Sequence, residues 1–201
     1  MQRHLCAITL CLAAGLAHAQ TAAPPTVRLR GTVQAATPTT VTVKDRTSGE
    51  TVELALGDKL AISEVYPIAL ADIRPNSFIG TAAMPQPDGS QRAIAVTVFP
   101  ESARGNGEGH RPFDLQPQST MTNATVADVV AAPDGRRLQL RYKDGEKTLV
   151  IPPGAPIVTF RPGDRSLLVP GASVSLTAQE IAGKPTALRI NAGRNGFVLP
   201  Y

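Results

Sequence analysis

One histidine and two carboxylates lie close together near the middle of the chain and could ligate a metal ion. His110 is the only histidine after residue 19, and Glu108 and Asp114 lie within four residues of it. An imidazole with carboxylates is a donor set for zinc and other divalent metals. A single imidazole makes a weak site, and a surface histidine bonded locally is the simpler interpretation. We therefore expect no resident cofactor, and keep divalent metal ligation by these three residues as the alternative.

The same segment carries glycines and arginines that could hold an anion. Gly105, Gly107 and Gly109 alternate with other residues, and Arg104 and Arg111 flank the run. Backbone N–H groups of such a run can cradle an anion. Two prolines follow, so the run does not open a helix as phosphate-binding loops do, and the Walker lysine and hydroxyl are missing. A connecting loop is therefore the alternative interpretation.

Arginines also alternate with apolar residues in two segments that read as strands. Arg137 and Arg141 share one face of the run 136–143, and Arg28 and Arg30 share one face of an earlier run. Such a face could contact anionic envelope polymers or lipid headgroups, although a solvated outer face is the simpler explanation. The candidate contacts to an anion or a partner are four arginines: Arg104, Arg111, Arg137 and Arg141.

Catalytic motifs find little support. A Ser-His-Asp triad needs an imidazole base, and His110 is the only histidine after residue 19 that could serve as one. The Gly-x-Ser-x-Gly motif of a nucleophile elbow does not occur. Acids such as Asp58 and Asp88 stand at expected turns, where their side chains stabilise the bend. We therefore assign no catalytic residue and expect a protein that is not an enzyme. A hydrolase built on unidentified acidic residues is kept as an alternative.

Residues 1–19 have the pattern of a secretory signal peptide. A short basic start precedes an apolar run of about a dozen residues and the small-residue site Ala17-His18-Ala19. Both cysteines, Cys6 and Cys11, lie in this leader, so thiol chemistry and disulfides are excluded from the mature chain. No later stretch is apolar enough to span a membrane. We expect a periplasmic or secreted protein with a flexible tail at 20–26.

The composition argues against nucleic-acid binding. The formal net charge is +4 at pH 7, without a concentrated basic run. The chain has no tryptophan, three tyrosines and five phenylalanines, whereas nucleic-acid binders usually interleave aromatic residues with a basic stripe.

The sequence also repeats itself. Residues 27–99 and 123–192 run through similar short apolar segments and turns, at an offset between 93 and 97 residues. Ile62 corresponds to Ile157, for example, and Pro75-Asn76 corresponds to Pro170-Gly171. Two copies with so long a period indicate duplicated domains and not a solenoid.

Within each copy the pattern is that of β-strands. Apolar and polar residues alternate over runs such as 27–33, 40–44 and 91–99, with turn pairs such as Asp88-Gly89 between runs. Only 67–74 has helix-like spacing. We predict an all-β protein with very little helix: two tandem small OB-like β-barrels packed together, at 27–99 and 123–201, joined by a Gly/Pro-rich connector at 100–122. A β-sandwich spread over both halves is the rival architecture.

Three segments carry a resemblance to a known family. They are Arg30-Gly31-Thr32-Val33, the turn Leu70-Ala71-Asp72-Ile73-Arg74-Pro75-Asn76, and Ala93-Ile94-Ala95-Val96. The unit resembles a family of exported bacterial OB-like barrels of unknown function, and the resemblance covers both halves. The connector is similar to a stretch in uncharacterised proteobacterial exported proteins. The resemblance implies tandem barrels in the cell envelope.

These observations lead to one expected function and two alternatives. We expect a non-enzymatic binding or scaffold protein of the bacterial cell envelope, acting through the barrel faces or the cleft between them. Its partner would be an envelope protein, a polysaccharide or a small ligand, with peripheral membrane contact possible and no nucleic acid. The first alternative is a periplasmic metal-handling accessory protein using His110, and the second is the hydrolase.

Overall fold

The computed structural model describes residues 25–133 and 135–201, so the expected signal peptide at 1–19 lies outside the described residues. The chain is all-β, as predicted, and the helical segments among its described residues are three short 3-10 turns, η1 (Leu70–Asp72), η2 (Glu101–Ala103) and η3 (Arg165–Leu167). Within the described ranges, no helix is long and apolar enough to cross a membrane. The strands run in chain order as β1 (Thr26–Ala36), β2 (Thr40–Asp45), β3 (Thr51–Pro67), β4 (Phe78–Pro85), β5 (Gln91–Val98), β6 (Gly109–Pro112), β7 (Thr120–Ala132), β8 (Gly135–Tyr142), β9 (Gly145–Ile151), β10 (Ile157–Pro162), β11 (Ser173–Ile181) and β12 (Lys184–Gly193).

The strands follow from the alternation in the sequence. In β2, Val41 and Val43 are fully buried, while the alternating Thr40 and Thr42 are only partly buried. The Asp88-Gly89 pair makes the expected tight turn between β4 and β5. Gly89 has a φ of 83°, and the Asp88 carboxylate accepts hydrogen bonds from the backbone and the hydroxyl of Ser90.

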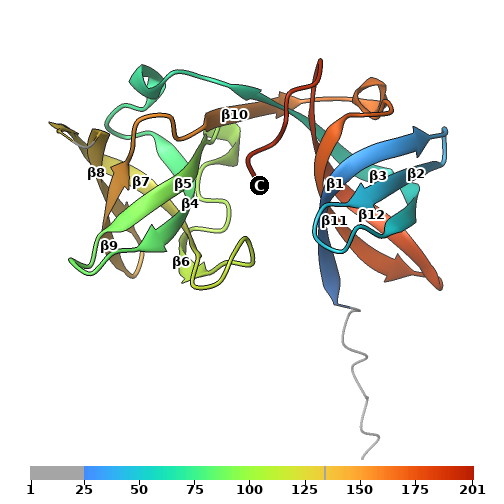
Figure 1. The fold of residues 1–201 in the computed structure, drawn as a ribbon, viewed down its shortest axis with the longest axis horizontal. Helices are drawn as coiled ribbons and strands as arrows, with labels where there is room; N and C mark the ends of the chain where they lie inside the picture. The colour runs from blue at the N-terminus through green and yellow to red at the C-terminus, as the bar shows by residue number, and fades with distance from the viewer. Residues whose placement is uncertain (1–24, 134) are drawn as a thin grey trace, which may run out of the picture.

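The strands form two closed groups (Figure 1). The first, lobe 1, comprises β1, β2, β3, β11 and β12, and it closes where β12 pairs in parallel with β3. The second, lobe 2, comprises β4, β5, β7, β8 and β9, and it closes where β5 pairs in parallel with β9. β6 adds to the edge of β7, and β10 lies between β3 and β5.

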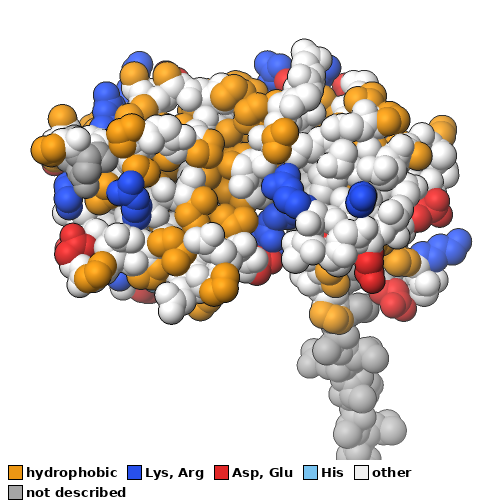
Figure 2. All heavy atoms as spheres, in the orientation of Figure 1, with side chains coloured by type: hydrophobic (Ala, Val, Ile, Leu, Met, Phe, Trp, Pro, Cys, Tyr) orange, Lys and Arg blue, Asp and Glu red, His pale blue; other side chains and the backbone are white. Residues whose placement is uncertain are grey.

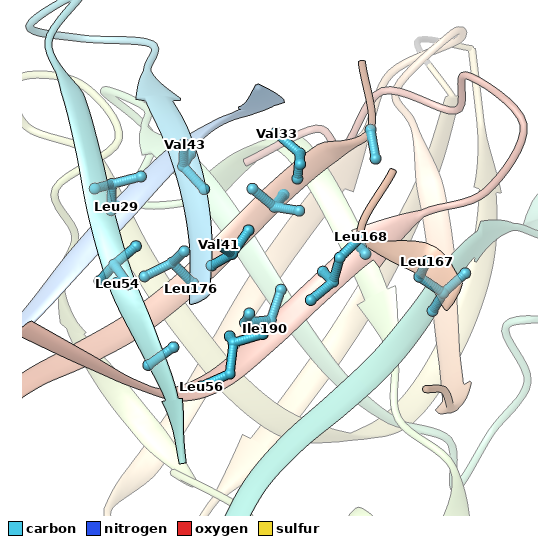
Figure 3. Close-up of a cluster of buried hydrophobic side chains, with 14 of the residues drawn as sticks. Leu29, Val33, Val41, Val43, Leu54, Leu56, Leu167, Leu168, Leu176 and Ile190 are labelled. Atoms are coloured by element: carbon cyan, nitrogen blue, oxygen red, sulfur yellow. The ribbon is translucent and has the colours of Figure 1, made fainter. Parts of the chain in front are cut away.

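Each lobe therefore combines strands from both halves of the sequence. The core of lobe 1 packs Leu29, Val41 and Leu54 against Leu176 and Ile190, and Figure 3 shows these side chains pointing toward one another. The core of lobe 2 likewise joins residues 73–98 to residues 124–157. The expected ranges 27–99 and 123–201 thus describe the repeat along the sequence, and not the way in which the two lobes share strands.

The length of β3 explains this exchange. A typical strand has five or six residues, whereas β3 has 17 and continues beyond the wall of lobe 1. Its last residues pair with β10, so the chain enters lobe 2 before β4 and β5 begin. In the second half, β10 occupies the corresponding position and leads toward β11 and β12 of lobe 1.

The connector is more ordered than a loop. Within the expected range 100–122, η2 is followed by β6, which pairs with β7 from Gly109 to Pro112. A backbone hydrogen bond from Phe113 to the Ser119 carbonyl then closes the turn that leads into β7. The connector thereby lies against lobe 2 and reaches the space between the lobes.

Candidate functional site

A cleft of about 490 Å³ lies between the two lobes. Residues from both lobes, from the connector and from the last three positions of the chain line it. Figure 2 shows apolar side chains meeting basic ones in the hollow between the lobes, where the chain ends in Figure 1. A pocket of this volume lies within the ordinary range of small-molecule sites.

The two walls of the cleft carry residues at positions that the predicted sequence repeat relates to one another. In each corresponding pair, one residue lies on the lobe 1 wall and the other on the lobe 2 wall. The pairs, with the lobe 1 residue given first, are Arg28 with Met121, Arg30 with Asn123, Ser175 with Gly80, and Asn191 with Thr97. The lobe 1 wall is basic and polar at these positions, while the lobe 2 wall has small, apolar or uncharged residues. The same backbone scaffold therefore presents two chemically different surfaces to one space.

Two arginines of β1 share a single carboxylate at the edge of this cleft. Because alternate residues of a strand point to one face, Arg28 and Arg30 lie together on the outside of lobe 1 while Leu29 enters its core. An Arg30 Nη donates to an Asp114 carboxylate oxygen over 2.7 Å, and an Arg28 Nη lies 3.6 Å from the same oxygen. The hydrogen bond from Arg30 is the main cause of the lowered pKa of Asp114.

The ring of Phe113 contacts the same two arginines. Their guanidinium carbons lie 5.6 Å (Arg28) and 5.2 Å (Arg30) from the centre of its ring, within the range of cation–π contacts. The ring also meets the ring of Tyr201 edge-on at 5.9 Å. The connector thus fixes the orientation of the basic wall.

Two further arginines complete the basic surface. Arg111 of β6 donates to the Gly107 carbonyl over 2.8 Å, and Arg189 of β12 is exposed beside the cleft. No acidic side chain in the described ranges forms an ion pair with Arg189. The lining within these ranges contains four arginines and no aspartate or glutamate side chain, and the Asp114 carboxylate pairs with two of the four, Arg28 and Arg30.

The cleft also holds polar atoms that lack a partner among the described residues. Asn123 is 7% exposed, and its side-chain nitrogen donates to the Asn106 carbonyl over 2.9 Å, but its Oδ1 accepts nothing. Arg30 Nε is likewise buried without an acceptor. Leaving a buried polar group unpaired costs about 1–3 kcal/mol. Groups of this kind are suited to bind a ligand that supplies the missing hydrogen bonds.

Aromatic and apolar side chains form the floor of the cleft. Phe99 contacts Phe78 and Phe160 edge-on, at ring distances of 5.3 and 5.5 Å. Leu199 is buried against Val65 and Val158 at the junction of the lobes. The Tyr201 hydroxyl lies 2.5 Å from the hydroxyl of Thr97, and burial raises the pKa of this tyrosine. The end of the chain is therefore packed into the cleft.

The three residues predicted to bind a metal ion each interact with a different partner. His110 Nδ1 lies 2.8 Å from the Thr122 hydroxyl, Glu108 accepts from the backbone N–H of Lys143, and Asp114 binds the two arginines. Burial and the positive charge of Lys147 lower the pKa of His110. In the described part of the chain, no group of three or more histidine or carboxylate side chains is placed to hold an ion.

The four arginines predicted to contact an anion have different surroundings. Arg111 lines the cleft, whereas Arg104 makes two hydrogen bonds to the Glu101 carboxylate at 2.6 and 2.8 Å and a third to the Asn76 carbonyl. Arg141 borders a separate shallow hollow on lobe 2, and Arg137 is exposed on β8. Of these four arginines, the structure therefore brings only Arg111 into the cleft between the lobes.

Sequence reasoning missed most of the cleft. The alternation of Arg28 and Arg30 was visible as a basic strand face, and the predicted repeat aligned Arg30 with Asn123, but nothing in the sequence placed these two residues in one cleft or connected them to Phe113. Arg189 and Tyr201 carried no motif. Pairing of distant strands, which the sequence pattern does not specify, creates this arrangement.

Comparisons with protein-family models, with curated proteins and with solved structures find no match to this chain. The fold and the geometry of the cleft are therefore the observations on which a function can be proposed.

Proposed function

We propose that the protein is an exported, non-enzymatic binding protein of the bacterial cell envelope, and that its ligand occupies the cleft between the lobes. The observation that carries this proposal is the composition of the cleft, where Arg28, Arg30 and Arg189 of lobe 1 and Arg111 of β6 line one space that contains no acidic side chain within the described ranges. Export is inferred from the leader-like residues 1–19, and the assignment of the lobes as OB-like barrels belongs to the same proposal.

The groups in the cleft favour binding over catalysis. Guanidinium groups remain charged at every physiological pH, so they hold anions but do not exchange protons during a reaction cycle. The remaining polar lining groups in the described ranges are amides and hydroxyls, which orient a ligand through hydrogen bonds. The unpaired atoms of Asn123 and Arg30 add one acceptor and one donor for that purpose.

Native mass spectrometry of the protein recovered from the envelope fraction of producing cells tests the proposal. We expect a bound small molecule that is released on denaturation. Ala61 is exposed on β3 and lines the cleft, so Ala61→Trp should fill part of the space and reduce ligand occupancy strongly.

The matched control is Ala131→Trp, which adds the same side chain at an exposed position of β7 outside the cleft lining. This variant should retain the bound molecule. Absence of any bound molecule, or equal occupancy in both variants, would overturn the assignment of the cleft as the binding site.

A further inference from the structure

We infer that the ligand of this cleft is a small amphipathic anion: one carboxylate or phosphate group joined to an apolar body. The inference rests on the proposed function and adds the chemical class of the ligand. It follows from the division of the cleft into a basic wall on lobe 1 and an apolar floor at the junction of the lobes.

The basic wall selects the anionic end. Arg28 and Arg30 share one carboxylate, so the pair retains a positive charge; Arg189 adds another on the same wall, and Arg111 of β6 adds one from the lobe 2 side. Guanidinium groups bind carboxylates and phosphates through paired, charge-assisted hydrogen bonds. The side chain of Arg30 is 14% exposed, so its charge is less screened than that of a surface arginine.

An unpaired donor marks where the anion can bind. Arg30 Nε is buried and has no acceptor among the described residues, while an Nη of the same group is held by Asp114. An oxygen of the ligand that accepted from this Nε would satisfy the donor without breaking the ion pair. A neutral or cationic ligand would leave the positive charges uncompensated.

The apolar floor selects the rest of the ligand. Val65, Val158 and Leu199 form a buried cluster beneath the cleft, and Phe160 packs against it. Met121 stands on lobe 2 at the position that corresponds to Arg28 on lobe 1. Burial of methylene groups against such a floor is favourable in proportion to the apolar area removed from water.

The volume limits the size of the ligand. A space of about 490 Å³ that also holds the end of the chain suits a small molecule and not a folded partner. A polysaccharide would present repeated hydroxyl groups to the apolar floor, which would leave them without hydrogen bonds. The combination of charge, apolar surface and volume therefore favours a single-headed amphiphile.

Isothermal titration calorimetry with single-chain probes below their micelle concentrations tests this class. Dodecanoate and dodecyl phosphate represent the two sources of the anionic group, and dodecyltrimethylammonium and dodecanol keep the chain but change the head. We expect one or both anions to bind in a one-to-one complex, with an affinity that falls as salt rises. The cationic and neutral probes should bind at least about tenfold more weakly.

Arginine variants connect binding to the basic wall. We expect Arg30→Gln to weaken anion binding about tenfold or more, and Arg189→Gln to weaken it by a smaller factor. Arg189 is exposed, so its variant tests the inference even if Arg30→Gln fails to fold. The control is Arg92→Gln, at an exposed position of β5 outside the cleft lining, which should bind as the unmodified protein does.

The outcomes separate the ligand class from the proposed function. If dodecanol or the cationic probe binds as tightly as the anions, or if both arginine variants retain full affinity, the class is wrong. If no probe binds while a native ligand is still lost from Ala61→Trp, the class is again wrong but the cleft remains the binding site. If no probe binds and no native ligand is found, both proposals fail.

Discussion

Val65 of β3 pairs directly with Phe160 of β10, and these two residues are 95 positions apart in the sequence. That separation lies within the offset of 93–97 residues that the predicted repeat places between the two halves. A residue paired with its own counterpart places an approximate two-fold axis at that pair. The neighbouring pairs, Ser63 with Pro162 and Pro67 with Val158, fit the same axis.

The β-bulges obey the same relation. A register shift in β1 between Val33 and Ala35 has a counterpart in β7 between Val126 and Asp128. The two lobes therefore share local irregularities as well as strand order. The cleft lies beside this axis, so corresponding positions face one space, and substitution in one half alone makes its walls chemically different.

Exchange of strands predicts that neither half folds as a monomer. Residues 25–99 would keep β2 between β1 and β3, but β1 would lose β11, and β3 would lose β12 and β10, so lobe 1 could not close. We expect this fragment to give the poorly dispersed NMR spectrum of an unfolded chain. Exposed strand edges would also promote aggregation.

The matching control is a pair of fragments made by dividing the chain within the connector. Fragments 25–116 and 117–201, divided at an exposed loop, contain all the described strands between them. When mixed, they should form a one-to-one complex with the spectrum of the intact protein. A well-dispersed spectrum from monomeric 25–99 would contradict the shared architecture.

The buried carboxylate of Glu64 predicts that the stability of the folded protein depends on pH. This carboxylate is 5% exposed on β3 and lies 2.9 Å from an Nη of Arg161 and 3.1 Å from Nε of Arg194. The hydrogen bond from Arg161 is the main cause of its lowered pKa. Its contribution to stability is therefore present above the unfolded-state pKa of about 4.3 and is lost as pH falls through the lower folded value.

Thermal unfolding between pH 3 and pH 7 measures this contribution. We expect Glu64→Gln to lower the melting temperature at neutral pH and to flatten its decline in acid. Glu50→Gln, at an exposed turn, is the control and should follow the unmodified protein. An unchanged acid profile in Glu64→Gln would show that the buried ion pair does not couple to folding.

Gly80 predicts a steric cost at the apolar wall. A Cβ at this position would lie 2.8 Å from Asn123 Oδ1 and 2.8 Å from the Phe99 ring. We expect Gly80→Ala to lower the free energy of unfolding by about 1–3 kcal/mol in urea denaturation. Gly57→Ala is the control because a Cβ at Gly57 would lie 3.7 Å from its nearest neighbour, the Cγ2 of Thr186, which is an ordinary contact distance. Equal stability of the two variants would contradict the close packing around Asn123.

His110 predicts weak or no metal binding. Its ring is bonded to Thr122, and its lowered pKa reflects burial and Lys147 and not a cluster of acids. Titration with zinc or copper ions should release no more heat from the unmodified protein than from His110→Ala. A saturable heat that disappears only in the variant would instead support the metal-handling alternative.

The sequence supported the fold class because local chemistry determines local structure. Alternation predicted strands such as β2, and Asp88-Gly89 predicted the tight turn that Gly89 makes with a positive φ. Partner strands are a different matter, since alternation shows which face is buried but not which strand lies beside it. The alternation in the sequence therefore could not predict that the two lobes exchange strands.

Proximity in sequence was a poor guide to the site for a related reason. His110 and Arg111 are neighbours, yet adjacent side chains of a strand point to opposite faces. Arg111 consequently lines the cleft while His110 bonds to Thr122. The cleft itself joins Arg30 to Asn123, which are 93 residues apart, and the repeat that aligns them does not predict that they face one space.

The most direct test of the binding site is an NMR titration of the isotopically labelled protein with dodecanoate. We predict that the amide shifts concentrate at the two walls of the cleft, including Arg30, Phe113 and Asn123, and that they saturate with one equivalent. Shifts that concentrate on the outer face of either lobe, or that spread evenly over the surface without saturating, would contradict a binding site between the lobes.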